Sequence, residues 1–111
     1  LVTLKNSANQ YQTVAAAAAQ RTDVDLNKLN TLLFQSERQL LSAQGLPIRP
    51  WYKNAVYAPG YYTGYGVKTL PGLREAIENR DWKLAQQQEI IIAKVLTDYA
   101  AKIDEATAVL K

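Results

Sequence analysis

The apolar positions of the first 21 residues recur at intervals of three and four, which places them on one face of a helix. They are Leu1, Leu4, Ala8, Tyr11, Ala15 and Ala18. The alanine run 15–19 favours helix intrinsically and adds little bulk, so a neighbouring helix can approach closely. The pattern predicts a helix over residues 1–21.

A second stripe of leucines follows at the same kind of spacing. It runs through Leu26, Leu29, Leu33 and Leu40, and Leu32 and Leu41 widen it. Thr22 and Asp25 stand at capping-box spacing ahead of it, with aspartate in place of the usual glutamate or glutamine. Gly45 and Pro47 mark the end. These signals predict a helix over residues 23–44.

The C-terminal part of the chain again has helical periodicity. Thr69 is a candidate N-cap with Pro71 in the first turn, which predicts a short helix over residues 70–80. Asp81 is the expected cap of a long helix over residues 81–110. The stripe of this helix runs through Leu84, Gln88, Ile92, Val95, Tyr99, Ile103, Ala106 and Leu110. Two further isoleucines, at positions 90 and 91, lie off the stripe, and a lone three-helix unit would not cover them, which indicates partner surface.

Residues 45–69 interrupt the helices with a long aromatic loop. Three prolines and four glycines between residues 45 and 66 exclude a long helix. Six of the ten aromatic residues lie between Trp51 and Tyr65, and no acidic residue occurs from Arg38 through Arg74. A loop of this length is usually functional, and its aromatic content argues against disorder. The predicted fold class is all-α: one domain, residues 1–111, forming a bundle of three main helices and a short one.

The composition excludes several kinds of chemistry. The chain has no histidine and no cysteine, which removes the commonest zinc ligands, the usual neutral-pH base and every thiol nucleophile. Acidic neighbours such as Glu75 with Glu78, or Asp104 with Glu105, are interpreted as solvated helix surface. The net charge of +3 is too small to indicate nucleic-acid binding. We therefore expect no catalytic residues, no metal and no cofactor in this chain.

The tyrosines of the loop allow two interpretations. Tyr57, Tyr61, Tyr62 and Tyr65 can each offer apolar contact together with a hydroxyl hydrogen bond. With basic neighbours such as Lys68, the loop suits an anionic ligand or an aromatic interface. Equally, the rings could simply anchor a long loop onto the bundle or onto a companion domain.

One continuous segment carries a family resemblance. Residues 45–59 read GLPIRPWYKNAVYAP, and they resemble a signature of the C-terminal helical domain of the transferrin receptor and glutamate carboxypeptidase II family. The Tyr57-Ala58-Pro59 element, Tyr65 and the LPGL segment at 70–73 keep the spacing of the carboxypeptidase branch. The receptor branch lacks the Tyr-Ala-Pro element, so the peptidase branch is the closer match. The flanking helices fit the domain as well, so the resemblance covers essentially the whole chain.

The resemblance implies a dimerisation domain without chemistry of its own. In this family the domain follows a zinc-peptidase domain with an inserted apical domain, in the ectodomain of a type II membrane protein of the secretory pathway, cell surface or vacuole. The expected partners are a second copy, through a four-helix bundle, and those upstream domains, which would also hold the zinc. No direct membrane contact is expected. The expected dimer and bundle faces are Leu26, Leu29, Leu33, Leu40, Ile92, Val95, Tyr99 and Ile103. The chain would begin inside the family's domain, and we expect it to self-associate.

The resemblance also gives the loop a role. In the peptidases this loop lines the pocket for the C-terminal residue of the substrate, where a lysine followed by a tyrosine holds the substrate carboxylates. Tyr65 falls on that tyrosine, but Gly64 occupies the lysine position, and the spacing does not let Lys68 replace it. The charged anchor that the resemblance associates with a C-terminal glutamate is therefore missing. The alternatives are an inactive receptor-like or trafficking homologue and, more distantly, a stand-alone basic helical module.

Overall fold

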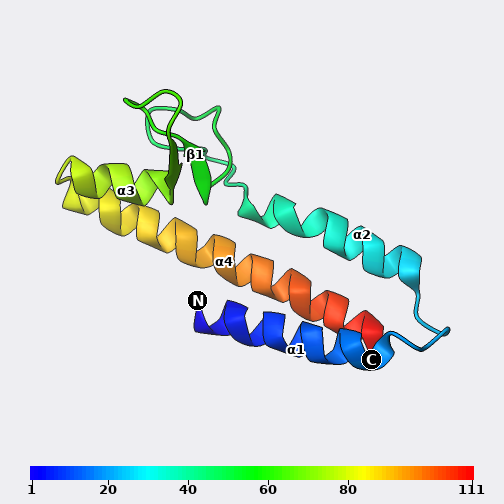
Figure 1. The fold of residues 1–111 in the computed structure, drawn as a ribbon. Coiled ribbons are helices and arrows are strands. Elements are labelled where there is room, and N and C mark those ends of the chain that lie inside the picture. Colours follow the sequence, from blue (N-terminus) through cyan, green and yellow to red (C-terminus); the bar gives the residue numbers. More distant parts are fainter. The chain divides into compact units, whose positions relative to one another are not determined.

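Helices with one buried face make up most of the chain, and a small β-hairpin interrupts them (Figure 1). The computed structural model describes residues 1–111. The elements are α1 (Val2–Ala18), α2 (Leu26–Ser36), the 3₁₀-helix η1 (Glu37–Leu40), β1 (Tyr57–Pro59), β2 (Val67–Thr69), α3 (Pro71–Glu78) and α4 (Trp82–Leu110). The chain divides into two compact units, one of Leu1–Gln39 with Leu96–Lys111 and one of Leu40–Val95. Helix α4 contributes residues to both.

The first unit packs α1, α2 and the C-terminal part of α4 around a small core (Figure 1). Ala18, Leu29, Ala106 and Leu110 are its buried centre, and half-buried side chains such as Tyr11 and Leu32 surround it. Ala106 is fully buried, so the small residue lets the backbones approach closely. Arg21 donates from Nη1 to the carbonyl oxygen of Leu110 at 2.8 Å, which satisfies an unpaired carbonyl at the end of α4.

Helix α2 is shorter than the periodicity predicts at both ends. Its N-cap is Asp25, whose carboxylate accepts from the backbone N–H of Lys28 at 3.0 Å, so the predicted cap at Thr22 is wrong. At the other end the helix passes at Ser36 into η1 instead of continuing to residue 44. Residues beyond it are engaged elsewhere, because Ser42 donates its N–H to the carbonyl oxygen of Lys53 at 2.7 Å. Pairing with a distant segment therefore overrides the local helical pattern.

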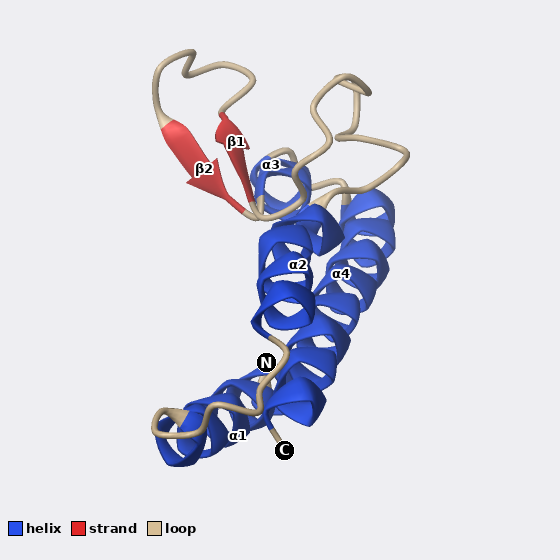
Figure 2. Cartoon of the chain, turned by 90° about the vertical axis from the view of Figure 1, so that its right-hand side faces the viewer, coloured by secondary structure: helices blue, strands red, loops and turns tan.

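The second unit contains strands that the sequence pattern did not predict. Strands β1 and β2 pair antiparallel, with Tyr57 opposite Thr69 and Pro59 opposite Val67 (Figure 2). Both strands contact α3. A two-stranded hairpin is marginal by itself, so this packing supplies stability that three-residue strands lack. The chain is thus mostly helical with a small sheet, and the interval 45–69 is a structured segment rather than a plain loop.

Helix α3 packs against the hairpin, and the first part of α4 lies close to α3 in the same unit. The residue before α3 is Leu70 with a φ of 48°, so the predicted Thr69 cap is wrong, whereas Pro71 does stand in the first turn. The expected cap of α4 is confirmed, because Asp81 accepts from the backbone N–H of Leu84 at 3.0 Å. The predicted stripe of α4 is buried or half-buried at every position. A Cβ added at Gly72 would stand 2.2 Å from the side-chain oxygen of Gln88, which shows how closely α3 approaches α4.

Gly45 is the glycine whose replacement should cost most. Its φ is +71°, and a Cβ there would lie 2.2 Å from the backbone oxygen of Pro50. Gly45→Ala is therefore expected to destabilise the fold by at least about 2 kcal/mol, because both the backbone strain and the overlap must be relieved. Gly64 is the matched control, since its φ is also positive but nothing lies within 4 Å. Gly64→Ala should cost only about 1 kcal/mol, and equal losses in urea denaturation would contradict the steric explanation.

Candidate substrate-pocket loop

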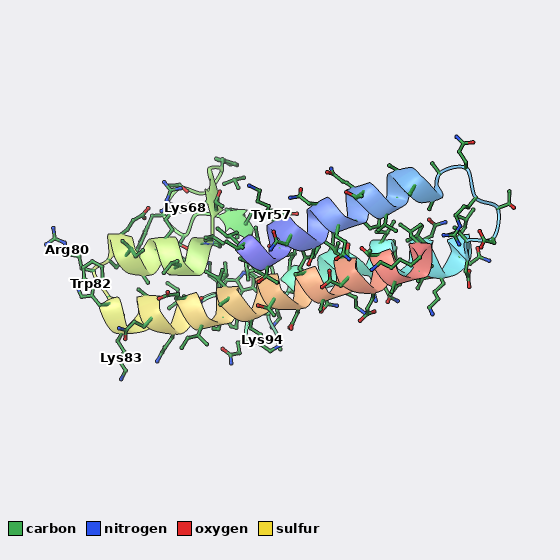
Figure 3. All side chains as sticks on the ribbon, turned by 90° about the horizontal axis from the view of Figure 1, so that it is seen from below. Tyr57, Lys68, Arg80, Trp82, Lys83 and Lys94 are labelled. Atoms are coloured by element: carbon green, nitrogen blue, oxygen red, sulfur yellow. The ribbon has the colours of Figure 1, made fainter.

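Residues 60–66 connect β1 to β2 and carry the residues singled out at the loop tip. We refer to this segment as the 60–66 loop. Tyr65 and Tyr62 are among its exposed side chains, and the Tyr65 ring has no protein cover. Tyr57 lies exposed on β1 and Lys68 lies half-buried on β2 (Figure 3). The structure thus presents Tyr65 outward, whereas Lys68 belongs to the strand below.

The backbone of the 60–66 loop closes on itself. Gly60 donates its N–H to the carbonyl oxygen of Gly66 at 2.8 Å, which joins the two ends. Tyr65 donates its backbone N–H to the carbonyl oxygen of Thr63 at 2.7 Å. The hydroxyl of Thr63 donates to the carbonyl oxygen of Gly66 at 3.2 Å. Gly64 adopts the left-handed region that this tight path requires. The loop is therefore a compact unit whose position depends on what holds its ends.

The beginning of the loop is held by Arg49. The guanidinium group donates from Nη1 to the carbonyl oxygen of Pro59 at 2.5 Å and from Nη2 to a carboxylate oxygen of Glu75. It also lies over the rings of Tyr52 and Tyr61, 5.5 and 5.6 Å from their centroids. Only 6% of the Arg49 side chain and 15% of the Glu75 side chain are exposed, so this ion pair is largely desolvated.

Glu75 uses its second carboxylate oxygen for the loop itself. That oxygen accepts from the backbone N–H of Tyr61 at 2.9 Å. The sequence pattern predicts a solvated helix surface for Glu75 and Glu78, and for Glu75 this prediction is wrong. The sequence does contain a signal for such a pairing. Glu75 and Glu78 are the first carboxylates after the long basic segment without acidic residues that begins at Arg38. Arg49 was likewise missed, because local spacing gives no indication of a partner on another element.

The other end of the hairpin is held by Glu78, one turn along α3 from Glu75. Lys68 donates to Glu78 at 2.5 Å, and Arg74 donates to its other carboxylate oxygen at 3.1 Å. The hydrogen bond from Lys68 lowers the pKa of the Glu78 carboxyl; partial desolvation opposes this, and Arg74 adds to the lowering. The Lys68 side chain is only 12% exposed, so its ammonium group is committed to this pair. The tip of the 60–66 loop consequently carries no cation.

The lowered pKa of Glu78 predicts how this end responds to acid. A carboxyl whose folded pKa lies below its unfolded value of about 4.3 stabilises the fold above that value, and this contribution disappears as pH falls through the folded pKa. The midpoint of urea unfolding should therefore fall between pH 7 and pH 3 more steeply for the unmodified chain than for Glu78→Gln. Parallel pH profiles for the two proteins would contradict this role.

A cavity of about 160 Å³ lies beneath the aromatic part of the loop. Its walls include Ile48, Tyr61, Tyr62, Ala76 and Leu84, and the Arg49–Glu75 pair borders it. The rings of Tyr61 and Tyr62 meet edge to face with centroids 4.8 Å apart. Tyr61 and Tyr62 therefore line this cavity, although Tyr62 stays largely exposed, and Tyr65 is not among its walls.

The residues predicted for dimer and bundle faces fall into different environments. Leu29, Ile92 and Val95 are buried within the chain. Leu40, Tyr99 and Ile103 are half-buried. In contrast Leu26 and Leu33 are exposed on α2, and Phe34 beside them is 74% exposed with Arg38 over its ring. We refer to Leu26, Leu33 and Phe34 as the α2 stripe.

The described residues, which are the whole of 1–111, contain no group of three or more acidic side chains, histidines or cysteines placed to hold a metal ion. None of the helices combines the length and apolar character needed to cross a bilayer. The charged side chains near the loop are used in the hydrogen bonds and ion pairs that hold it to its own unit.

Comparison with known proteins adds a family to this geometry. The model of the transferrin receptor-like dimerisation domain matches residues 1–104. The chain belongs to the transferrin receptor-like dimerisation domain family. The resemblance found in the sequence is thereby confirmed, and members of this family are named for association rather than for catalysis.

Relatives of this dimerisation domain fit the carboxypeptidase branch. A probable glutamate carboxypeptidase LAMP1 of Arabidopsis thaliana is 44% identical over 54 residues, 49% of this chain and 8% of that protein. A putative zinc metalloprotease TRE2 of Saccharomyces cerevisiae is 38% identical over 86 residues, 70% of this chain and 11% of that protein. A probable glutamate carboxypeptidase of Arthroderma benhamiae is 42% identical over 57 residues, 50% of this chain and 8% of that protein. The match therefore spans about a tenth of the relatives' length.

Proposed function

We propose that this dimerisation domain builds the homodimer of a membrane-anchored, zinc carboxypeptidase-like protein, and that its 60–66 loop lines the substrate pocket of the parent. The observation that carries the first part is the family match over residues 1–104. The zinc and the catalytic acid would belong to an upstream peptidase domain, which fits the absence of histidine here.

The α2 stripe is the surface that we assign to the partner copy. Leu33 and Phe34 lie seven and eight positions after Leu26, so the three share one side of α2 while Leu29 and Leu32 face the core. Related by a two-fold axis, two such stripes would bury each other and complete a four-helix bundle. Sedimentation equilibrium should then give twice the chain mass of 12.4 kDa, and a monomer at high concentration would count against the assignment.

The proposed role of the loop follows from what it presents. Tyr65 extends a ring and a hydroxyl into solvent, and Gly64 beside it has nothing within 4 Å. Lys68 is the nearest cation in the sequence, but it is paired with Glu78. A pocket lined by this tip would bind a substrate carboxylate through the tyrosine hydroxyl and would favour an uncharged C-terminal side chain.

Replacing Tyr65 tests this role in the intact parent. Tyr65→Ala is expected to raise KM for peptide substrates about tenfold with little change in kcat, because a binding contact is lost and no reacting group is touched. Trp82→Ala is the control, since Trp82 is an exposed aromatic residue at the start of α4 (Figure 3). Equal KM values for the Tyr65→Ala and unmodified enzymes would contradict the assignment of the loop to the substrate pocket.

The second candidate function is dimerisation of an inactive, receptor-like or trafficking homologue. The observation that favours it is Gly64, which stands where the resemblance expects a cationic anchor. Zinc analysis of the intact parent separates the two. Stoichiometric zinc with a histidine and carboxylate ligand set upstream supports the peptidase, and loss of that set supports the receptor.

A further inference from the structure

The start of the 60–66 loop is joined to the rest of its unit by two side chains from distant parts of the chain. Arg49 comes from the turn after residue 45, and Glu75 comes from α3. Arg49 binds the carbonyl of Pro59, and Glu75 binds the N–H of Tyr61, so the pair holds the backbone on both sides of Gly60. Gly60 is also the residue that closes the loop against Gly66.

The hydrogen bonds of Arg49 and Glu75 do more than neutralise two buried charges, because they also fix the loop backbone. A desolvated ion pair is seldom more stable than apolar residues of similar size, because removing both charges from water offsets their attraction. Here the guanidinium and carboxylate divide their hydrogen bonds between each other and the loop backbone, and the two rings lie over the guanidinium. Such charge-assisted contacts fix orientation as well as distance.

We propose that Arg49 and Glu75 are positioning residues that hold the 60–66 loop so that Tyr65 is presented at one defined place. This inference rests on the proposed function of the loop, because Tyr65 is the residue that would meet the substrate. Arg49 and Glu75 themselves do not reach the tip: both are largely buried, whereas Tyr65 is fully exposed. They act through the backbone at Pro59 and Tyr61.

The decisive variant removes the pair without leaving a buried charge. In Arg49→Met with Glu75→Met the apolar side chains occupy similar volume and no charge is left buried, so the midpoint of unfolding should fall much less than when either partner is removed alone. The amide of Tyr61 loses its acceptor, and its hydrogen exchange in the 111-residue chain should accelerate about tenfold. In the intact parent KM should rise at least about fivefold with kcat nearly constant. Glu89→Gln, which removes an exposed carboxylate of α4, is the control and should change none of these.

The outcomes separate this inference from the function on which it rests. Unchanged exchange at Tyr61 in the double variant overturns the positioning role. So does an unchanged KM in the double variant when Tyr65→Ala does raise KM. If Tyr65→Ala leaves KM unchanged, the pocket assignment fails, and Tyr61 exchange alone then decides whether the pair holds the loop. Glu75→Gln is a second test. The amide has only one acceptor oxygen, which cannot accept from both Arg49 and Tyr61, so hydrogen exchange at Tyr61 should accelerate in this variant too.

Discussion

Arg49→Ala should lower the free energy of unfolding by about 3–5 kcal/mol, the largest loss that we expect from a single substitution in this chain. The substitution leaves the Glu75 carboxylate largely buried without its cation and removes the donor to Pro59. It also removes the guanidinium group that lies over the rings of Tyr52 and Tyr61. Urea unfolding followed by far-ultraviolet circular dichroism measures this loss, because most of the chain is helical.

The control for this experiment is Lys83→Ala. Lys83 is an exposed cation near the start of α4 (Figure 3), so its loss should change stability by less than about 0.5 kcal/mol. A loss below about 1 kcal/mol for Arg49→Ala would show that water reaches Glu75 easily, and that the pair is not the desolvated contact described above.

Leu33→Asp should weaken the proposed dimer by at least about 100-fold. Leu33 lies in the middle of the α2 stripe, and a two-fold interface would place the new charge there twice. Because Leu33 is 38% exposed in the single chain, the substitution should cost the monomer much less than truncation of the buried Leu29. Sedimentation velocity across a concentration series would then show monomers at concentrations where the unmodified chain is dimeric.

Thr31→Asp provides the matched change on α2. Thr31 is exposed on the side of α2 that faces away from Leu26, Leu33 and the core, so the same added charge should weaken association far less. If both substitutions weaken association equally, net charge rather than the stripe controls it. If neither does, the dimer contact lies on another surface and the assignment of the α2 stripe is wrong.

The helices were the most predictable part of the fold. The burial of the α4 stripe from Leu84 to Leu110 was predicted correctly, because a helix that buries one side places apolar residues at the helical period along the sequence. The cap at Asp81 is a local interaction over three residues and was equally readable. The hairpin was not, since three-residue strands leave too short an alternation to detect and gain their stability from contact with α3.

In the candidate site, too, the features marked by local sequence could be predicted and those that depend on tertiary contacts could not. Tyr65 and Gly64 were found at the tip because the family signature and its ungapped spacing mark them. The spacing does not let Lys68 replace a cation at Gly64, and its pairing with Glu78, ten residues away, gives the structural reason why its charge is absent from the tip.

Periodicity and motif spacing are properties of neighbouring residues, so the helices, the aromatic segment and the dimerisation family could be predicted before the fold was known. The contact of Arg49 with Glu75, 26 residues away, and their joint hold on the start of the loop could be seen only in the folded chain. A buried ion pair depends on which surfaces the fold brings together, and charge order along a chain does not encode that meeting. The same holds for the α2 stripe, whose leucines look alike in the sequence until packing buries Leu29 and leaves Leu33 exposed.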